Sequence, residues 1–224
     1  MNMSSYQKTV EFWNDIFSKE SSDFDHRESF PFEEIEKCLD WLISDGDSVI
    51  DFGCGNGKLL MRCLAKGAER GVGIDISPEG IENGKKLAKK NGIEDRTEML
   101  VGDVVDLEKY DDNEFDVGIL SNVIDNLIPE DARRLIEEFK RVIKPGGKIF
   151  LKLNDHMEPE ELEEYNAEKI SENFYREESG IYLWNLKDED VKELLGEDLT
   201  IVDKKDVEFE EHDQINRLFY VKNE

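Results

Sequence analysis

The chain has 224 residues, with 29 Lys and Arg against 55 Asp and Glu, so its formal net charge at pH 7 is −26. A surface this acidic argues against DNA or RNA as a partner, because nucleic-acid affinity depends largely on Lys and Arg neutralising phosphates. The chain contains no run of about 18 consecutive apolar residues, so neither a membrane span nor a membrane partner is expected.

The cysteines are Cys38, Cys54 and Cys63, and their spacing matches no metal-ligand pattern. We expect reduced thiols and no metal site. Residues 1–10 lack the apolar core of a secretion signal, so the sequence predicts a cytoplasmic protein. No linker rich in Pro, Gly or Ser and no internal repeat interrupts the chain, which predicts a single domain over residues 1–224.

Two amphipathic helices are predicted before the first strand, over residues 4–19 and 32–43. Tyr6, Trp13 and Phe17 follow the spacing i, i+7 and i+11, which places them on one face of the first helix. Aromatic residues at helical spacing most often pack a helix onto its domain. Shaping a ligand pocket is the alternative role for the same face.

The stretch from Ser48 to Lys58 predicts a nucleotide-cofactor loop. Residues 48–52 are apolar and β-branched, which is typical of a strand covered on both faces. The pattern D-x-G-x-G-x-G follows, and glycine both accepts positive φ and lets a ligand approach the backbone closely. A helix is predicted next, and the free N–H groups at its N-terminus can hold an anion.

Glycine spacing then separates two kinds of cofactor. Counted from Gly53, the dinucleotide fingerprint G-x-G-x-x-G requires glycine where this chain has Lys58. The observed pattern instead resembles motif I of the class I S-adenosylmethionine-dependent methyltransferases, which have a Rossmann-like fold. The resemblance implies that S-adenosylmethionine is the cofactor, and a nicotinamide-dependent oxidoreductase is the less favoured alternative. The predicted loop residues of the cofactor site are Asp51, Gly53, Cys54, Gly55 and Gly57.

A second strand, residues 71–75, is predicted to end at an acid that binds ribose. Asp75 lies 22 positions after Gly53. In Rossmann-like folds an acid about 20 residues beyond the glycine loop accepts hydrogen bonds from the ribose hydroxyls. Ser77 is better placed to cap the helix that follows, so Asp75 is predicted to bind ribose and Ile76 to flank the adenine.

The third predicted strand, residues 97–101, leads to Asp103 and Val104. The resemblance implies that this position meets the adenine edge. The Asp103 carboxylate would accept from the adenine amino group, and the Val104 backbone N–H would donate to a ring nitrogen. A solvent-facing turn is the alternative for Asp103.

The fourth predicted strand, residues 115–120, is followed by Ser121 and Asn122. Open parallel sheets bind ligands at the carboxyl ends of their strands, near the switch in strand order. Together with the resemblance, this places Ser121 and Asn122 against the methionine part of the cofactor. Asp125 and Asn126 are predicted either to contact substrate or to cap the next element.

A long amphipathic helix is predicted over residues 129–144, stopped by Lys144-Pro145-Gly146-Gly147 before a fifth strand. An acidic helix-like stretch then runs from Glu158 to about Glu172. Aromatic residues around a Ser-Gly turn predict a β-hairpin, and they are expected either to line an apolar pocket or to pack the hairpin on the body. These aromatic residues are Phe174, Tyr175, Tyr182 and Trp184.

These elements predict an α/β fold, doubly wound, with a seven-stranded and mostly parallel sheet whose last strand is antiparallel. Helices cover both faces, a helical lid precedes the sheet, and a hairpin is inserted after strand five. The predicted single methyltransferase domain then has four parts. They are an N-terminal lid (1–44), a cofactor-binding core (45–154), a substrate-side insertion (155–187) and a closing helix with two strands (188–224).

The predicted reaction is in-line methyl transfer to an unidentified small-molecule acceptor. Much of its rate can come from aligning the acceptor, the methyl carbon and the sulfur. A general base is needed only if the acceptor must lose a proton, and His156 is the candidate nearest the predicted site. No catalytic residue is otherwise assigned, and a non-catalytic S-adenosylmethionine-binding protein is the second alternative.

Overall fold

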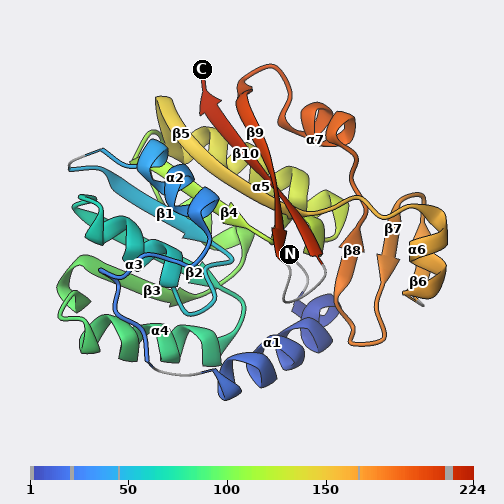
Figure 1. Cartoon of the computed structure of the whole chain (residues 1–224), viewed down its shortest axis with the longest axis horizontal. Coiled ribbons are helices and arrows are strands. Elements are labelled where there is room, and N and C mark those ends of the chain that lie inside the picture. The colour runs from blue at the N-terminus through green and yellow to red at the C-terminus, as the bar shows by residue number, and fades with distance from the viewer. Residues whose placement is uncertain (1–2, 21–22, 45, 166, 210–213) are drawn as a thin grey trace.

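The computed structural model describes residues 3–20, 23–44, 46–165, 167–209 and 214–224. Seven strands form one sheet in the order β3-β2-β1-β4-β5-β10-β9 (Figure 1). β1 pairs in parallel with β2 and β4, whereas β10 runs antiparallel to β5 and β9. The predicted fold class is therefore confirmed. The strands are β1 Ser48–Phe52, β2 Arg70–Asp75, β3 Thr97–Val101, β4 Phe115–Ser121, β5 Ile143–Asn154, β9 Leu199–Phe209 and β10 Gln214–Asn223.

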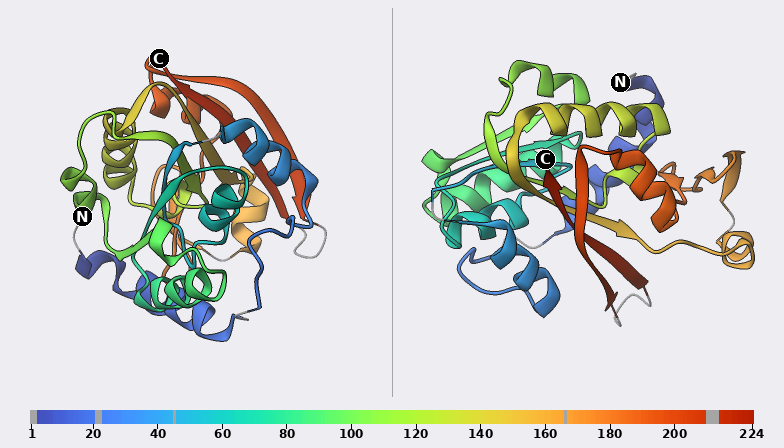
Figure 2. Two further views of the ribbon diagram at one scale, coloured as in Figure 1. Left: turned by 90° about the vertical axis from the view of Figure 1, so that its left-hand side faces the viewer. Right: turned by 90° about the horizontal axis from the view of Figure 1, so that it is seen from above.

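Helices cover both faces of this sheet (Figure 2). One face carries α2 Glu33–Leu42, α3 Lys58–Ala65 and α4 Pro78–Lys90, and the other carries η3 Val104–Lys109, α5 Pro129–Val142 and α7 Asp188–Leu195. The remaining helices are η1 Met3–Tyr6, α1 Gln7–Lys19, η2 Glu94–Arg96, η4 Ile124–Asn126 and α6 Pro159–Glu164. Among the described residues, no helix is both long enough and apolar enough to cross a bilayer.

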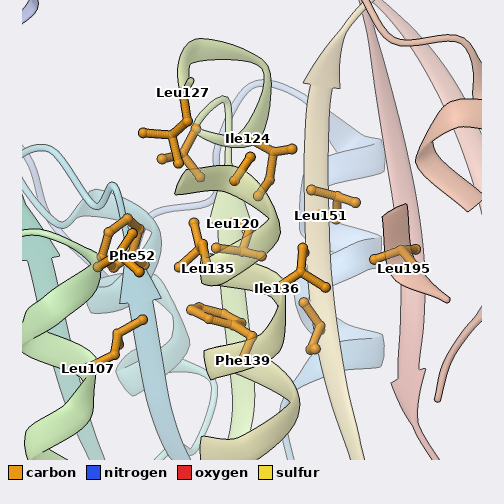
Figure 3. Close-up of a cluster of buried hydrophobic side chains, with 14 of the residues drawn as sticks. Phe52, Leu107, Leu120, Ile124, Leu127, Leu135, Ile136, Phe139, Leu151 and Leu195 are labelled. Carbon is orange, nitrogen blue, oxygen red and sulfur yellow. The ribbon is translucent and has the colours of Figure 1, made fainter. Parts of the chain in front are cut away.

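Apolar side chains fill both interfaces between the sheet and its helices. Under α5, Phe139 of α5 packs against the sheet among residues of β1, β4 and β5 (Figure 3). Gly118 of β4 leaves room for this ring, because a Cβ there would lie 2.7 Å from it. Leu60 and Phe150 belong to the cluster on the opposite face. Since both faces are buried, the central strands read as continuous apolar runs.

The order of the strands creates a crevice at the carboxyl ends of β1 and β4. From β1 the chain proceeds outward to β2 and β3, then returns to the far side of β1 and continues through β4 and β5. Connections therefore leave β1 and β4 in opposite directions. Ligands bind in open α/β sheets at such a point.

The connection between α5 and β5 differs from the prediction. The helix ends at Val142 rather than at residue 144, and β5 already begins at Ile143. Ile143 is buried and pairs with Phe115, after which the register shifts. The Pro-Gly-Gly segment is thus an irregularity inside the strand, because pairing with β4 outweighs the local turn signal.

The insertion also differs from the predicted long helix. α6 ends at Glu164, and β6 Glu168–Ser171 pairs antiparallel with β7 Phe174–Arg176. β8 Tyr182–Trp184 completes a three-stranded sheet that includes the predicted hairpin. The acidic stretch has helix-forming residues but lacks a long apolar stripe at helical spacing, so strand pairing decides its structure.

Helix α1 lies across the carboxyl ends of the strands, between α4 and β8 (Figure 1). On the α4 side, the Asn83 side chain donates to the Phe17 carbonyl at 2.8 Å. On the hairpin side, the Thr9 hydroxyl donates to the Gly180 carbonyl at 3.2 Å, and Tyr182 donates to the Ser5 carbonyl at 3.1 Å. α1 is therefore tied to two parts of the chain that are distant in sequence.

Candidate cofactor and active site

A cavity of about 290 Å³ lies at the carboxyl ends of β1, β2 and β4, beneath α1. Tyr6, Thr9, Trp13 and Phe17 form its α1 side. Most of the predicted cofactor residues line it. They are Asp51, Gly53, Cys54, Gly55, Asp75, Ile76, Asp103, Ser121 and Asn122.

The glycine loop has the positive φ angles that its composition predicts. Gly53, Gly55 and Gly57 have φ of +73°, +55° and +74°. A Cβ on Gly55 would lie 2.6 Å from the Phe17 ring, and one on Gly53 would lie 2.8 Å from Val123. The space that we expected a ligand to use at these two glycines is thus occupied by protein side chains. Gly57 abuts Met99 and does not line the cavity.

Asp51, at the penultimate position of β1, is 1% exposed and lines the cavity. Neither of its carboxylate oxygens has a hydrogen-bond partner among the described residues. Burial, followed by the nearby Asp75 carboxylate, raises the pKa of Asp51 to about 8. The Leu60 backbone N–H is near enough to oppose this shift, but it makes no hydrogen bond of normal geometry to either oxygen. A buried carboxylate without a partner is costly, so this site favours a cationic hydrogen-bond donor.

Asp75 holds the glycine loop against β2. One carboxylate oxygen accepts from Gly55 N at 2.7 Å, and the other accepts from Ser77 N at 2.8 Å. Burial raises the pKa of Asp75, and these backbone N–H groups partly offset the effect. An ionised carboxylate has about four acceptor positions, so Asp75 keeps acceptor capacity toward the cavity. Ser77 itself caps α4, as predicted, by accepting from Gly80 N.

Asp103 and Val104 occupy different positions relative to the cavity. Asp103 lines it and also caps η3, since its side chain accepts from Val105 N at 2.8 Å. Its own N–H donates to Asp106, which completes a capping box. Val104 is fully buried in the core and does not line the cavity.

At the end of β4, Asn122 lines the cavity in the left-handed backbone region, with φ +54°. Its backbone N–H donates to the Lys152 carbonyl at 2.8 Å. Asn126 also lines the cavity, whereas Asp125 is buried behind it and accepts from Asn154. Of these two predicted substrate contacts, the structure therefore brings only Asn126 to the cavity.

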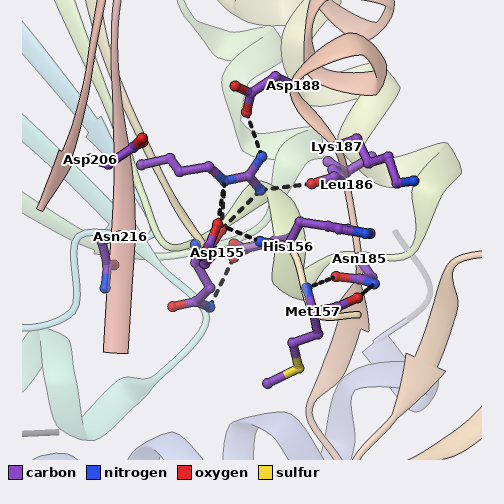
Figure 4. A network of polar contacts seen from close by, with 12 residues as sticks. Asp155, His156, Met157, Asn185, Leu186, Lys187, Asp188, Asp206 and Asn216 are labelled. Carbon is purple, nitrogen blue, oxygen red and sulfur yellow. Dashed lines mark hydrogen bonds and ion pairs between the residues drawn. The ribbon is translucent and has the colours of Figure 1, made fainter. Parts of the chain in front are cut away.

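His156 lies away from this cavity. β5 ends at Asn154, and the chain then turns toward the small sheet, where His156 lines a separate pocket with Tyr175 and Asn185 (Figure 4). Its Nε2 is 4.0 Å from a Glu158 carboxylate oxygen. The position of His156 therefore does not support the predicted role of general base.

The other two histidines do not supply that base. The His26 ring nitrogen lies 2.9 Å from the Asn91 side-chain oxygen, near the end of α4 and outside the cavity. His212 lies outside the described residues.

The hairpin aromatics pack the hairpin rather than line the cavity. Tyr182 stacks on Phe174 with ring centroids 5.3 Å apart and meets the Tyr6 ring edge-on at 5.6 Å. Trp184 is buried, and the Arg133 guanidinium lies over its ring at 5.3 Å. Tyr175 lines the separate pocket of His156. These contacts pack the hairpin against η1 and α5, which is the packing alternative.

Tyr6, Trp13 and Phe17 line the cavity, which is the pocket-shaping alternative for this face, whereas several other cavity residues had no sequence signal. The Tyr6 hydroxyl donates to Asp131 and accepts from Ile128 N, both at 2.8 Å, which fastens α1 to the start of α5. The aromatic spacing in α1 identified the buried face but not what it covers. The further residues missed are Phe52, Asn56, Lys58, Leu59, Gly102, Val123 and Leu127.

A family model described as a methyltransferase domain matches residues 43–199. The chain belongs to this family. A curated relative of this methyltransferase, the ribosomal protein L11 methyltransferase of Photobacterium profundum, is 31% identical over 137 residues, which are 60% of the chain and 44% of the relative. The methyltransferase thus spans less than half the length of such relatives.

Solved structures share the fold of this methyltransferase. An S-adenosylmethionine-dependent methyltransferase from Methanosarcina mazei superposes with a TM-score of 0.70 at 21% identity, over 88% of this chain and 98% of that one. The 1,6-didemethyltoxoflavin-N1-methyltransferase of Burkholderia thailandensis, solved with S-adenosylhomocysteine, gives 0.69 at 15% identity, over 98% and 86% of the two chains.

The protein therefore contains a methyltransferase domain, and its fold is the one found in solved S-adenosylmethionine-dependent methyltransferases. The family match favours the predicted methyltransferase over the nicotinamide-dependent oxidoreductase. The predicted small-molecule acceptor is contradicted, because the curated relatives are named for methylating a ribosomal protein. A net charge of −26 favours cationic partners of either kind, so charge alone did not separate a small molecule from a protein.

Proposed function

We propose that this enzyme transfers a methyl group from S-adenosylmethionine to a protein acceptor in the cytoplasm. The names of the curated relatives support a protein acceptor. The net charge of −26 would favour encounter with a basic polypeptide, because complementary charge accelerates association. The cysteines, all three of them free thiols, agree with a reducing compartment.

The observation that best supports a cofactor site here is the Asp51 carboxylate in the cavity wall, which has no hydrogen-bond partner among the described residues. A cationic ammonium that donates hydrogen bonds there would offset the cost of burying this charge. In our proposal Asp51 therefore holds the α-ammonium group of the cofactor's methionine part. Asp75 accepts from the ribose hydroxyls and Asp103 from the adenine amino group. Asp51 and Asp75 lie at the carboxyl ends of β1 and β2, and Asp103 follows β3; these three strands are neighbours in the sheet.

When bound, S-adenosylmethionine supplies an electrophilic methyl carbon whose bond to sulfur breaks, leaving the electron pair on sulfur, as the acceptor's lone pair attacks. The contributions of the protein are alignment and exclusion of water. α1 covers the cavity, and Ser121 at the end of β4 would face the methionine part. No side chain of the cavity is assigned as a general base.

The proposal is tested with methyl-labelled S-adenosylmethionine and a cell extract divided into protein and low-mass fractions. We expect label in acid-precipitable material that protease digestion releases. The Asp51→Ala variant should transfer much less label, whereas a variant of the exposed Asp95, Asp95→Asn, should match the wild type. Label confined to the low-mass fraction would overturn the protein acceptor. Unimpaired binding of S-adenosylhomocysteine by Asp51→Ala would overturn the role of Asp51.

A further inference from the structure

A chain of buried hydrogen bonds lies behind Asn122. Asp125, which is 3% exposed, accepts from both the backbone N–H and the side-chain Nδ2 of Asn154, each at 2.9 Å. The Asn154 side-chain oxygen accepts in turn from Asn122 Nδ2 at 2.8 Å. The Asn216 side-chain oxygen accepts from the same Nδ2 at 3.2 Å.

The chemistry of the groups fixes the direction of each bond. The Asn154 backbone N–H can only donate, so the Asp125 oxygen it meets is an acceptor, and the Asn154 side chain must offer that oxygen its NH₂ group. The side-chain oxygen of Asn154 is then turned to Asn122, where it requires a hydrogen-bond donor. Asn122 therefore uses both hydrogens of its amide on Asn154 and Asn216. The side-chain oxygen of Asn122, Oδ1, lies at the opposite edge of the same amide group.

The surroundings hold this arrangement in place. The backbone carbonyl oxygen of Asn154 accepts from Arg217 Nε at 3.1 Å and from Arg217 Nη2 at 2.9 Å. Arg217 also donates to the Asp188 carboxylate and the Leu186 carbonyl, each at 2.7 Å (Figure 4). Asn122 itself keeps an uncommon left-handed backbone, and such a conformation persists where neighbouring contacts determine it.

The position of Asn122 points to the acceptor rather than to the cofactor. The proposed contacts to adenine, ribose and the methionine ammonium lie at the carboxyl ends of β3, β2 and β1. Asn122 follows β4, and its side chain is bound to residues of β5 and β10, farther along the sheet. It still lines the same cavity. A methyl acceptor must approach from beyond the cofactor's methionine part, which is this side.

We propose that Asp125, acting through Asn154, is a positioning residue that keeps the side-chain oxygen of Asn122 turned to the cavity. There this oxygen accepts a hydrogen bond from the molecule that is methylated. The inference rests on the proposed function. It requires the methylated atom or its immediate neighbour to carry an N–H or O–H. An amine, amide or hydroxyl meets this condition, and an ionised carboxylate does not.

The test compares two substitutions of Asp125. In Asp125→Asn the side-chain carbonyl oxygen can still accept from Asn154. The new amide group replaces only the oxygen that accepts from Asn126 at 3.2 Å, so kcat should stay within about threefold of the wild type. Asp125→Leu offers no acceptor, so kcat should fall about 10- to 100-fold, the scale of a misplaced reacting group. Both variants should bind S-adenosylhomocysteine as the wild type does. Asp95→Leu, which removes an exposed carboxylate outside this network, is the matched control and should leave kcat unchanged.

Several results would overturn the proposal. Asp125 would instead be a proton acceptor if two results were seen together. Asp125→Asn would be inactive, and kcat of the wild type would rise with pH as a carboxyl group ionises. An unchanged kcat in Asp125→Leu would make the chain merely structural. A base-labile label on the product would indicate a methyl ester, and hence a carboxylate acceptor, whereas we expect a base-stable label.

A second measurement keeps this inference separate from the proposed function. In the ¹⁵N-labelled protein, the side-chain NH₂ of Asn122 should exchange slowly with solvent in the wild type and in Asp125→Asn, and rapidly in Asp125→Leu. If no protein is methylated but this pattern is seen, the proposed acceptor is wrong and the positioning chain stands. Rapid exchange in the wild type would refute the chain itself.

Discussion

Replacing Asp51 with Asn should stabilise the unliganded enzyme while weakening cofactor binding. The pKa of the buried Asp51 is raised from 3.8 to about 8. Above pH 4 the unfolded chain has released this proton and the folded chain still holds it, so stability falls as the pH rises from about 4 to about 8. The Asn variant has the same shape and no such linkage.

The magnitude follows from the linkage relation. Each pH unit in this window corresponds to about 1.4 kcal/mol for one fully linked group. Between about pH 5 and about pH 7, the stability of Asp51→Asn relative to the wild type should therefore grow by about 1–3 kcal/mol, the lower figure allowing for relaxation around the charge. For a chain of this size that is a change of about 2–10 °C in the difference between the two melting temperatures.

Thermal unfolding followed by circular dichroism at the two pH values measures this difference, with Asp95→Asn as the control for loss of one exposed acid. Calorimetry with S-adenosylhomocysteine completes the test. The wild type should bind more tightly as the pH rises toward about 8, because Asp51 must release its proton to pair with the ammonium group. A melting difference that does not change with pH, or equal affinities in both proteins, would refute the reasoning.

Three further changes probe the loop and its roof. Asp75→Ala should weaken S-adenosylhomocysteine binding by about 1–3 kcal/mol in calorimetry, the scale for hydrogen bonds to a charged group, and unchanged affinity would remove the ribose assignment. Gly55→Ala should lower the melting temperature, because its Cβ meets the Phe17 ring at 2.6 Å, and adding Phe17→Ala should relieve the clash but leave the strain of positive φ. If the second change gives no relief, the clash is not the cause. Tyr6→Phe removes hydrogen bonds at both 2.8 Å contacts and should cost about 1–3 kcal/mol in denaturant unfolding; a cost near zero would mean that water replaces the hydroxyl.

The sheet and its main helices were predictable because their signals are local. Residues 48–52 are continuously apolar, and α4 has both its Ser77 cap and its Pro78 start within the sequence. The stretch Glu158–Glu172 was mispredicted because strong helix formers carry no information about a pairing partner. There β7 decides the structure, and β6 forms in place of the second half of the predicted helix.

Site prediction succeeded where a motif is continuous along the chain and failed where distant segments meet. The glycine loop and Asp75 were found from spacing, since their relation is set by one strand, one turn and one helix. Asp51 was identified as part of the motif, but its lack of a partner is visible only in the folded chain. His156 follows β5 as Asn122 follows β4, yet the next turn directs it to another pocket.

The position of α1 has a consequence for turnover. Phe17 rests on Gly55, so we expect exchange of spent for fresh cofactor to move this end of the helix. The other end is held by the hairpin through Thr9 and Ser5. A polypeptide docking on the hairpin would therefore contact the segment that holds α1, and we expect its arrival to change how long S-adenosylhomocysteine stays bound. The dwell time of the product would then be set by the macromolecule being modified.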